Sequence, residues 1–278
     1  MINVFYSGDK NYFKQIFLST LSMAMHTKES LNIYIMTLDC KTKKGEYFAI
    51  TSEQIAFLEK TIKEYNVDSK ITLVRMDDLY EKNMANNCNK NSVYTPYALL
   101  RLLSHHLDML PEKIIYLDTD TMVYNDINEL YSIDLEDAEY GAVQDYVGHH
   151  FFGKNYINTG VLLLNLKRIR ETGLFDKCID YVATKRRFMP DQDAINYRRT
   201  KFKMLPRKFN EQRDVVDDTV IKHFCKIPHM FPIIHTVNIK QTNLEGVHNV
   251  LKITAFDEVY DKYLEITKGV DKELHLDL

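Results

Sequence analysis

The segment Lys113–Leu117 (KIIYL), followed directly by Asp118-Thr119-Asp120, decides the fold that we expect. Its nearly unbroken apolar run is typical of a β-strand that is covered on both faces. Strands of this kind lie inside α/β sheets, whose ligands bind beyond the carboxyl ends of the strands. The two aspartates therefore stand where an α/β protein would bind a ligand.

The chain before this strand alternates between strand-like and helix-like segments. Strands are expected at 2–6, 31–38 and 71–76, and helices at 12–26, 51–65 and 95–110. Thr51 and Gln54 predict a capping box at the start of the second helix, and Thr95-Pro96 predicts the start of the third. This order predicts a β-α-β-α-β-α-β arrangement over the first 120 residues, with a mainly parallel sheet.

After residue 125 the spacing of these segments changes. Strands are expected at 141–143, 160–164 and 201–205, helices at 166–185, 191–199 and 256–267, and a short apolar run covers 230–234. No internal repeat or low-complexity linker divides the chain, so we expect one domain over 1–278. Within it we expect a first half over 1–125, a second half over 126–240 and a helical extension over 241–278.

The composition excludes several classes of protein. The chain has 278 residues, 45% of them hydrophobic, which excludes a disordered or fibrous protein. Lys and Arg total 36 against 39 Asp and Glu, so no basic excess indicates a nucleic-acid partner. No apolar run approaches the roughly 20 residues of a membrane span, the N-terminus lacks the order of a signal peptide, and no cysteine pair is spaced as CxxC. We therefore expect a cytoplasmic protein with reduced thiols.

Asp118 and Asp120 are suited to bind a metal ion. Side chains at i and i+2 of extended backbone point the same way, so both carboxylates can address one hard cation. Such an ion would neutralise a diphosphate and stabilise it as a leaving group. The alternatives are an ordinary acidic turn and a haloacid-dehalogenase-type phosphatase, which also opens with a strand and D-x-D. Met122 departs from the phosphatase motif, which wants Thr or Val there, and the phosphatase motif normally opens its domain.

Five further motifs accompany this segment in a fixed order. The six motifs are Asp9-Lys10-Asn11-Tyr12, Tyr97–Leu102 with Arg101, Tyr116–Val123, Ile157–Leu166, Asp191–Asn196 and Ile233-Ile234-His235. Together they resemble the family 8 glycosyltransferases over most of the chain up to about residue 240. The resemblance implies a GT-A type α/β fold, with a Rossmann-like, mainly parallel central sheet, flanking helices and a C-terminal α/β elaboration. It also implies retaining transfer of a hexose, glucose or galactose, from a UDP-sugar to a glycan, lipid-linked glycan or protein acceptor. On this resemblance, 1–125 would be the nucleotide-binding half and 126–240 the sugar and acceptor half.

The resemblance assigns the metal to Asp118, Asp120 and His235, with His223 as the second choice for the histidine. An oxygen, oxygen and nitrogen ligand set suits Mn²⁺, with Mg²⁺ as the other option. The ion would bridge the diphosphate of the donor. Without the resemblance, a histidine at the end of an apolar run is more often structural.

The resemblance also assigns the donor-binding residues. They are Asp9, Asn11 and Tyr12 for the base and ribose, Arg101, Asp118 and Thr119 near the diphosphate, Asn158 and Thr159 near the sugar, and Lys240 on the diphosphate. The chain departs from the family after His235, because it keeps a lysine but lacks the Gly and the Pro-Trp of many relatives. This departure raises a second alternative, a catalytically silent nucleotide-sugar-binding protein of the same fold.

The expected catalytic residues are Gln192, Asp191 and Asp145. An amide is a poor nucleophile, so a glutamine facing the sugar indicates front-face substitution, with its carbonyl supporting positive charge on the sugar ring. Arg101 is expected to pair with Asp191 or Asp9. Asp145 is a second candidate for contact with sugar hydroxyls or the acceptor.

Two basic stretches, Lys185-Arg186-Arg187 and Arg207-Lys208, could face a membrane that carries a lipid-linked acceptor. The alternative is that they are solvated helix ends. Any membrane association is expected to be peripheral, at the inner face.

Overall fold

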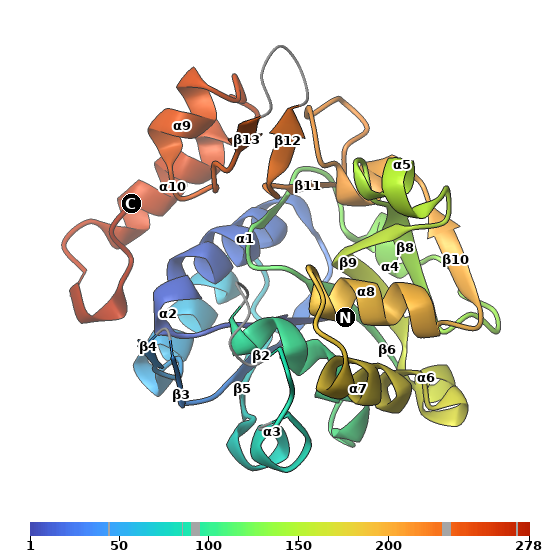
Figure 1. Cartoon of the computed structure of the whole chain (residues 1–278). Helices are drawn as coiled ribbons and strands as arrows, with labels where there is room; N and C mark the ends of the chain where they lie inside the picture. The colour runs from blue at the N-terminus through green and yellow to red at the C-terminus, as the bar shows by residue number, and fades with distance from the viewer. Residues whose placement is uncertain (44, 85, 90–94, 230–234, 271) are drawn as a thin grey trace.

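The computed structural model describes residues 1–43, 45–84, 86–89, 95–229, 235–270 and 272–278. The strands of its central sheet are β1 (Ile2–Ser7), β2 (Leu31–Thr37), β5 (Lys70–Arg75), β6 (Lys113–Leu117), β8 (Tyr140–Gln144), β9 (Ile157–Asn165) and β10 (Phe202–Leu205). Their order is β10-β8-β9-β6-β1-β2-β5 (Figure 1). Every pair is parallel except the two made by β9, which is antiparallel to β6 and β8. The predicted α/β class with a mainly parallel sheet is confirmed.

Helices cover both faces of the sheet. The hydrophobic core on one face includes α1 (Phe13–His26), α2 (Ser52–Lys63), α9 (Leu244–Asn249) and α10 (Asp257–Thr267). The core on the other face includes α3 (Asp77–Met84), η2 (Pro96–His106), α6 (Leu166–Thr172), α7 (Leu174–Thr184) and α8 (Pro190–Arg198). Burying a sheet on both faces in this way is what a parallel sheet requires.

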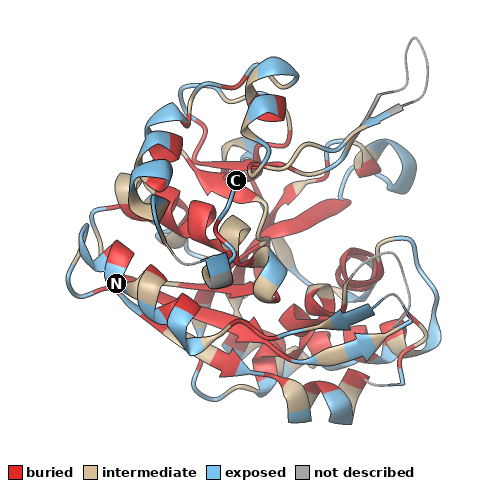
Figure 2. Ribbon diagram, turned by 90° about the vertical axis from the view of Figure 1, so that its left-hand side faces the viewer, coloured by how far each residue is buried: buried red, intermediate tan, exposed pale blue. Residues whose placement is uncertain are grey.

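The sequence of β6 alternates between these two cores. Ile115 and Leu117 belong to the core that includes α1, whereas Ile114 and Tyr116 belong to the core that includes η2. Successive side chains of a strand point to opposite faces, so a strand buried on both sides reads as a continuous apolar run. Figure 2 shows the result, with buried residues gathered on the strands and on the inward sides of the helices.

The remaining elements are short. They are η1 (Lys10–Tyr12), β3 (Cys40–Thr42), β4 (Gly45–Tyr47), β7 (Thr121–Val123), α4 (Asn128–Tyr131), α5 (Gly148–Phe152), η3 (Arg207–Asn210), β11 (Ile221–His223), β12 (Ile227–His229), β13 (His235–Val237) and η4 (Lys272–Leu274). The C-terminal segment packs on α1, where the rings of Phe17 and Tyr263 meet edge to face at 5.4 Å between centroids. Of these short elements, β7 and β11 matter most for the site, because their antiparallel pairing joins two distant parts of the chain.

The expected helix over 166–185 is wrong as a single element. Gly173 adopts a left-handed conformation, with φ of 63°, which ends α6 and begins α7. Glycine pays no steric cost in that conformation and is the usual residue past a helix C-terminus. The apolar run at 230–234 lies outside the described residues.

The expected helix over 95–110 forms as the 3₁₀ helix η2, which is long for its type. Three of its side chains donate hydrogen bonds to carbonyls three residues earlier: Arg101 to Ala98, Ser104 to Arg101 and His105 to Leu102. Backbone hydrogen bonds in a 3₁₀ helix have poor geometry, so these side-chain bonds give the three carbonyls a further partner. They also fix the direction of Arg101, which reaches the site described below.

In the part of the chain that the structure describes, no helix combines the length and the apolar character needed to cross a membrane.

The capping box of α2 supports a stability prediction. The hydroxyl of Thr51 accepts from the backbone N–H of Gln54 at 3.2 Å, and the Gln54 side chain accepts from the Thr51 N–H at 3.0 Å. Thr51→Ala should lower the free energy of unfolding by about 1 kcal/mol, because it leaves one N–H of the first turn without a partner. Chemical denaturation measures this loss. Thr51→Ser keeps the hydroxyl and should retain most of the stability, so an equal loss in both variants would contradict the role of the cap.

Candidate active site

Asp118 and Asp120 follow β6 at the point where the strand order reverses. The chain builds β1, β2 and β5 outward in one direction and then places β6 on the other side of β1. The loops after β1 and β6 leave the carboxyl edge of the sheet at this reversal, and open α/β sheets bind their ligands there. The loop after β1 contains Asp9, as the sequence predicted.

Asp118 is held by two neighbours. Its Oδ1 accepts hydrogen bonds from the Tyr116 hydroxyl at 2.6 Å and from Arg101 at 2.7 Å. The guanidinium of Arg101 is buried, lies over the Tyr116 ring and donates to the Thr159 carbonyl at 2.6 Å. Burial by itself would lower the pKa of Arg101, but the interactions with Asp118, Tyr116 and Asp191 have the larger, opposite effect. The pKa of Arg101 is therefore raised above its ordinary value. The carboxylate of Asp118 is thus oriented before any ligand arrives, and its Oδ2 takes no part in these bonds.

His223 completes a three-residue cluster with the two aspartates. Strand β11 pairs with β7, immediately after the aspartates, and the register places His223 opposite Thr121. Its Nε2 lies 3.2 Å from Asp120 Oδ1 and 3.8 Å from Asp118 Oδ2. One ligand atom from each residue lies within 4.8 Å of the others, a spacing that a single metal ion can span.

The other ring nitrogen of His223 is held by Asn210. The distance from Nδ1 to Asn210 Oδ1 is 3.1 Å, and an amide oxygen only accepts, so Nδ1 carries the hydrogen. The lone pair of Nε2 then points toward the aspartates. Metal-binding histidines usually have this arrangement, in which the second nitrogen donates to an oxygen of the protein.

Gly160 is required by the close approach of β9 to this cluster. A Cβ at this position would lie 2.2 Å from His223 Cε1 and 2.9 Å from Asp118 Oδ2. It is therefore the ring of His223 that comes close to the backbone at this position. The two carboxylates, one imidazole and the glycine that makes room for them fit a divalent cation.

Lys240 also contacts Asp120. Its Nζ donates to Asp120 Oδ2, and to the Phe224 carbonyl at 2.9 Å. Burial alone would raise the pKa of Asp120, but the charge of Lys240 is the largest opposing cause, and the pKa lies well below the usual range. Burial would likewise lower the pKa of Lys240, and the charge of Asp120 reverses this and raises it. Lys240 therefore brings a positive charge to Asp120, as Arg101 does to Asp118.

Asp145, Asn158 and Gln192 form a second polar group beside the cluster. Asp145 Oδ2 accepts from the Asn158 amide at 3.0 Å and from the Gln192 amide at 3.1 Å. Asp145 Oδ1 accepts from the backbone N–H groups of Val147 and Gly148 at 3.1 and 2.6 Å. All of the strong acceptor positions of Asp145 are thus used within the chain. The Gln192 oxygen is directed toward the Thr159 N–H, at 3.2 Å.

Asp191 lies at the start of α8, with one oxygen 3.3 Å from Arg101. The predicted pairing of Arg101 with Asp191 is confirmed, and the alternative pairing with Asp9 is wrong. Asp9 instead accepts from the backbone N–H groups of Asn11 and Tyr12, at 2.9 and 3.0 Å, and caps η1. Burial raises the pKa of Asp191 in spite of the opposing charge of Arg101.

Thr119, the middle residue of the aspartate motif, ties the two loops together. Its hydroxyl donates to the Gln15 side chain at 2.9 Å, and its carbonyl accepts from Gln241 at 2.7 Å. Gln15 lies on α1 directly after the loop that contains Asn11 and Tyr12. The segments predicted to bind the base and the diphosphate are therefore neighbours.

The structure places His223, the second choice of the sequence, with the two aspartates. The backbone of His235 begins β13, and its side chain lies outside the described part of the structure, so the assignment to His235 stays a prediction. The sequence contained the same signal for His223, because Val220-Ile221 is also a short apolar run. The roles of Asn210 and Tyr116 were missed: Tyr116 lies in the aspartate motif but was given no role there, and no motif contains Asn210.

Several charges of the two basic stretches are engaged within the chain. Arg207 pairs with Glu211 and Lys208 with Glu129, each at 2.6 Å, and Arg187 lies over the Tyr181 ring. These contacts anchor the stretches to the surface of the protein itself.

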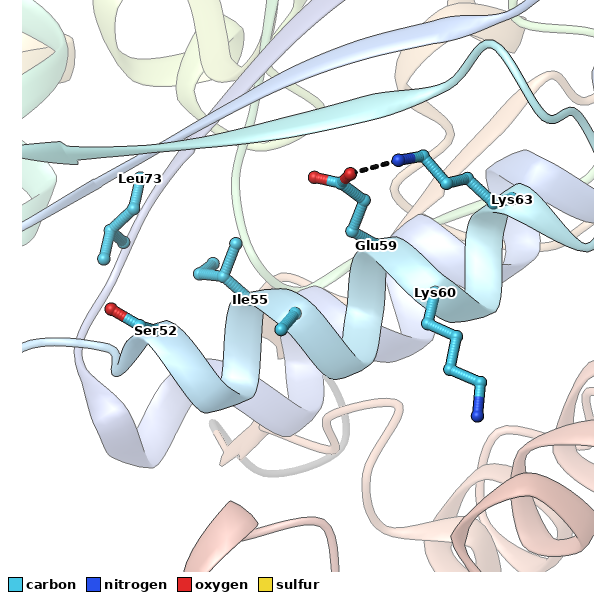
Figure 3. A pocket seen from close by; sticks show the side chains of 7 residues that line it. Ser52, Ile55, Glu59, Lys60, Lys63 and Leu73 are labelled. Atoms are coloured by element: carbon cyan, nitrogen blue, oxygen red, sulfur yellow. Dashed lines mark hydrogen bonds and ion pairs between the residues drawn. The ribbon is translucent and has the colours of Figure 1, made fainter.

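A separate shallow groove lies on the outside of α2 (Figure 3). It is lined by Ser52, Ile55, Ala56, Glu59, Lys60, Lys63 and Leu73. Glu59 and Lys63 pair with each other across one turn of the helix. None of the predicted site residues lines this groove, so we assign no chemistry to it.

Comparison with known families agrees with this geometry. The sequence profile described as "Glycosyl transferase family 8" matches residues 3–238. A lipopolysaccharide 1,2-glucosyltransferase of Escherichia coli is 26% identical over 258 residues, covering 81% of this chain and 71% of that protein. Glycosyltransferase GlyA of Streptococcus pneumoniae is 25% identical over 174 residues, covering 63% of this chain and 22% of that protein.

Among solved structures, the galactosyltransferase LgtC, in complex with donor and acceptor sugar analogues, has a TM-score of 0.69 at 16% identity. The alignment covers 100% of both chains. At this identity the similarity shows the fold alone, and it confirms the GT-A type of sheet that the sequence predicted.

The contact at Gly160 supports a test of the cluster. Gly160→Ala should displace the His223 ring and reduce Mn²⁺ affinity by roughly 10- to 100-fold, as loss of a supporting contact does at other metal sites. Titration with Mn²⁺ measures the affinity. In a His223→Ala background the same substitution should cost little more, because the ring that it displaces is gone. Unchanged Mn²⁺ affinity in Gly160→Ala would show that the cluster does not bind the ion.

Proposed function

Because the chain belongs to glycosyl transferase family 8 and is a glycosyltransferase, we propose that it transfers a hexose from a UDP-sugar to an acceptor with retention of anomeric configuration. The hexose is glucose or galactose, and the acceptor is a glycan, a lipid-linked glycan or a protein. The observation that carries the proposal is the cluster of Asp118, Asp120 and His223 at the carboxyl end of β6. Family membership removes the phosphatase alternative.

Asp118, Asp120 and His223 would hold the divalent cation, and a mixed carboxylate and imidazole set suits Mn²⁺ better than Mg²⁺. When bound, the ion neutralises the diphosphate and so makes it a better leaving group. Asp120 lies between His223 and Lys240, so it would contact both the ion and the lysine.

Lys240 is suited to hold the leaving diphosphate. Its ammonium already lies on Asp120, and its side chain is partly shielded from water. A cation in a water-poor site stabilises an anion strongly. We infer that Lys240 turns from Asp120 toward the diphosphate when the donor and the metal ion bind, which would compensate for the missing Gly and Pro-Trp of the motif.

Gln192 would face the donor sugar from α8. Its amide nitrogen is held by Asp145 and its oxygen points back toward Thr159, so the side chain is fixed at both ends. A fixed amide dipole can support positive charge on the sugar ring, and it offers no carboxylate nucleophile for double displacement. Asp145 is then a positioning residue, because its acceptor positions are occupied by Asn158, Gln192 and two backbone N–H groups.

Asp9, Asn11 and Tyr12 would bind the base and ribose. They follow β1 next to the aspartate loop, and Tyr12 lies near enough to Asp120 and Lys240 for their charges to affect the pKa of its hydroxyl. The product would belong to the cell surface in this proposal, because lipopolysaccharide glucosyltransferases are among the relatives. Nucleotide-sugar donors then place the reaction in the cytoplasm, at most peripherally at the inner face of the membrane.

The metal assignment is tested by slow hydrolysis of UDP-hexose in the presence of Mn²⁺. Asp120→Ala should abolish it, and His223→Ala should weaken Mn²⁺ binding by on the order of a hundredfold, because each removes a ligand. Excess chelator should abolish the activity of the unaltered protein. Full activity with chelator present, or in Asp120→Ala, would contradict the metal assignment.

The same experiment with His235→Ala decides between the two histidines. A greater loss of Mn²⁺ affinity in His235→Ala than in His223→Ala would return the role to His235. Binding of UDP and Mn²⁺ without any turnover of a UDP-sugar panel would instead support the catalytically silent alternative.

Gln192→Ala tests the proposed role of the amide. Turnover should fall by roughly a hundredfold, because a fixed dipole that stabilises developing charge is lost, while the affinity for UDP-hexose should change little. Single-turnover kinetics together with donor titration separate the two effects. A loss confined to donor affinity would contradict the charge-stabilising role, and Gln192→Glu, which keeps the volume, controls for packing.

A further inference from the structure

His105, His106 and Asp176 form a second group of metal-ligand residues, outside the site described above. Both histidines come from the end of η2, and Asp176 comes from the first turn of α7. One ligand atom of each lies within 4.8 Å of the others. The side chain of His105 is 4% exposed, that of His106 33% and that of Asp176 58%, so the group opens to solvent on one side only.

Both ring nitrogens of His105 face oxygens that accept hydrogen bonds. Its Nδ1 lies 3.0 Å from the Leu102 carbonyl, which can only accept, so Nδ1 carries a hydrogen. Its Nε2 lies 3.0 Å from Asp176 Oδ1, and a carboxylate can also only accept. A neutral imidazole has one hydrogen, so the lone pair of Nε2 would face the carboxylate. Either a second proton or a cation must lie between them.

We propose that His105, His106 and Asp176 bind a divalent transition-metal ion of the zinc type. Two imidazole nitrogens and one carboxylate oxygen are a usual ligand set for Zn²⁺ in proteins, with water as the fourth ligand. The N–H of His105 donates to a backbone carbonyl, as that of a metal-binding histidine commonly does. This proposal is independent of the donor chemistry at Asp118 and Asp120.

The distances fit a single small ion. Ligands that bind Zn²⁺ at about 2.0–2.2 Å in tetrahedral geometry lie about 3.3 Å from each other. The two imidazole Nε2 atoms lie 3.0 and 3.7 Å from Asp176 Oδ1, on either side of this value. The rings of His105 and His106 lie side by side, with centroids 3.8 Å apart, so both can turn toward one ion.

An ion at this place would fasten η2 to α7. The contact between the two elements is already tight, since the His105 ring meets the Phe175 ring edge to face at 5.8 Å. Arg101, which orients Asp118, lies on η2 little more than one turn before His105. A metal ion that binds only the folded state stabilises it in proportion to its affinity and concentration.

The chain provides a matched control in His149 and His150. These neighbours on α5 have the same ring geometry as His105 and His106, with centroids 3.8 Å apart and 38° between the planes. Among the described residues, no carboxylate completes a metal-ligand group with them. His150→Ala therefore removes an exposed histidine of a histidine pair without removing a predicted ligand.

The test counts zinc bound per chain after dialysis of the whole protein against a zinc-buffered solution. The unaltered protein and His150→Ala should each keep one equivalent of zinc per chain more than His106→Ala and Asp176→Asn keep. Added zinc should also raise the melting temperature of the unaltered protein and of His150→Ala more than that of His106→Ala and Asp176→Asn. Asp176 is exposed and Asn has nearly its shape, so this variant should fold even if His106→Ala does not.

Equal zinc counts and equal melting shifts in all four proteins would overturn the proposal. A pair held together by a second proton would produce this result, together with a stability difference between the protein and Asp176→Asn that appears at low pH without zinc. Cobalt substitution gives a separate check. A tetrahedral Co²⁺ absorption band should be present in the unaltered protein and in His150→Ala, and absent from Asp176→Asn.

Discussion

The arrangement of the site depends on the need of two adjacent carboxylates for positive charge. Asp118 and Asp120 end a strand that is buried on both faces, and charges at the edge of a core are costly unless they are paired. Arg101 pairs with Asp118, and Lys240 pairs with Asp120. The Nε2 atom of His223 lies near both aspartates. A cation bound at this cluster would add to the positive charge.

The residues that pair with the two aspartates come from distant parts of the chain and meet at one loop. Arg101 comes from η2 before the aspartates, His223 from β11 after them, and Lys240 from the start of the C-terminal segment. The neighbour of Lys240, Gln241, donates to the Thr119 carbonyl and accepts from the Tyr260 hydroxyl of α10. The C-terminal segment is therefore attached to the loop that holds the aspartates, and its packing on α1 and the geometry of the site support each other.

The local parts of the fold could be predicted from the sequence, and the non-local parts could not. The buried strand and the aspartate motif rest on short local patterns, whereas the pairing of Arg101 with Asp191 was one of two alternatives for residues far apart in the chain. The position of His223 rests on the pairing of β11 with β7, and the apolar run before His235, at 230–234, is the longer one in the sequence. Asn210 matters only through its contact with that histidine, so nothing in its own neighbourhood marks it.

A series of hydrogen bonds connects His223, through Asn210 and Asn158, to Asp145, and each residue donates to the next one in that order. The Asp145 carboxylate determines this direction. Asp145 can only accept, so the amides of Asn158 and Gln192 must both present their NH₂ groups to it. The Asn158 oxygen then faces the Asn210 NH₂ group, which turns the Asn210 oxygen toward His223 Nδ1. His223 must therefore carry a hydrogen on Nδ1. The same carboxylate aims the Gln192 oxygen away from itself, so one buried aspartate sets both the tautomer of His223 and the orientation of Gln192.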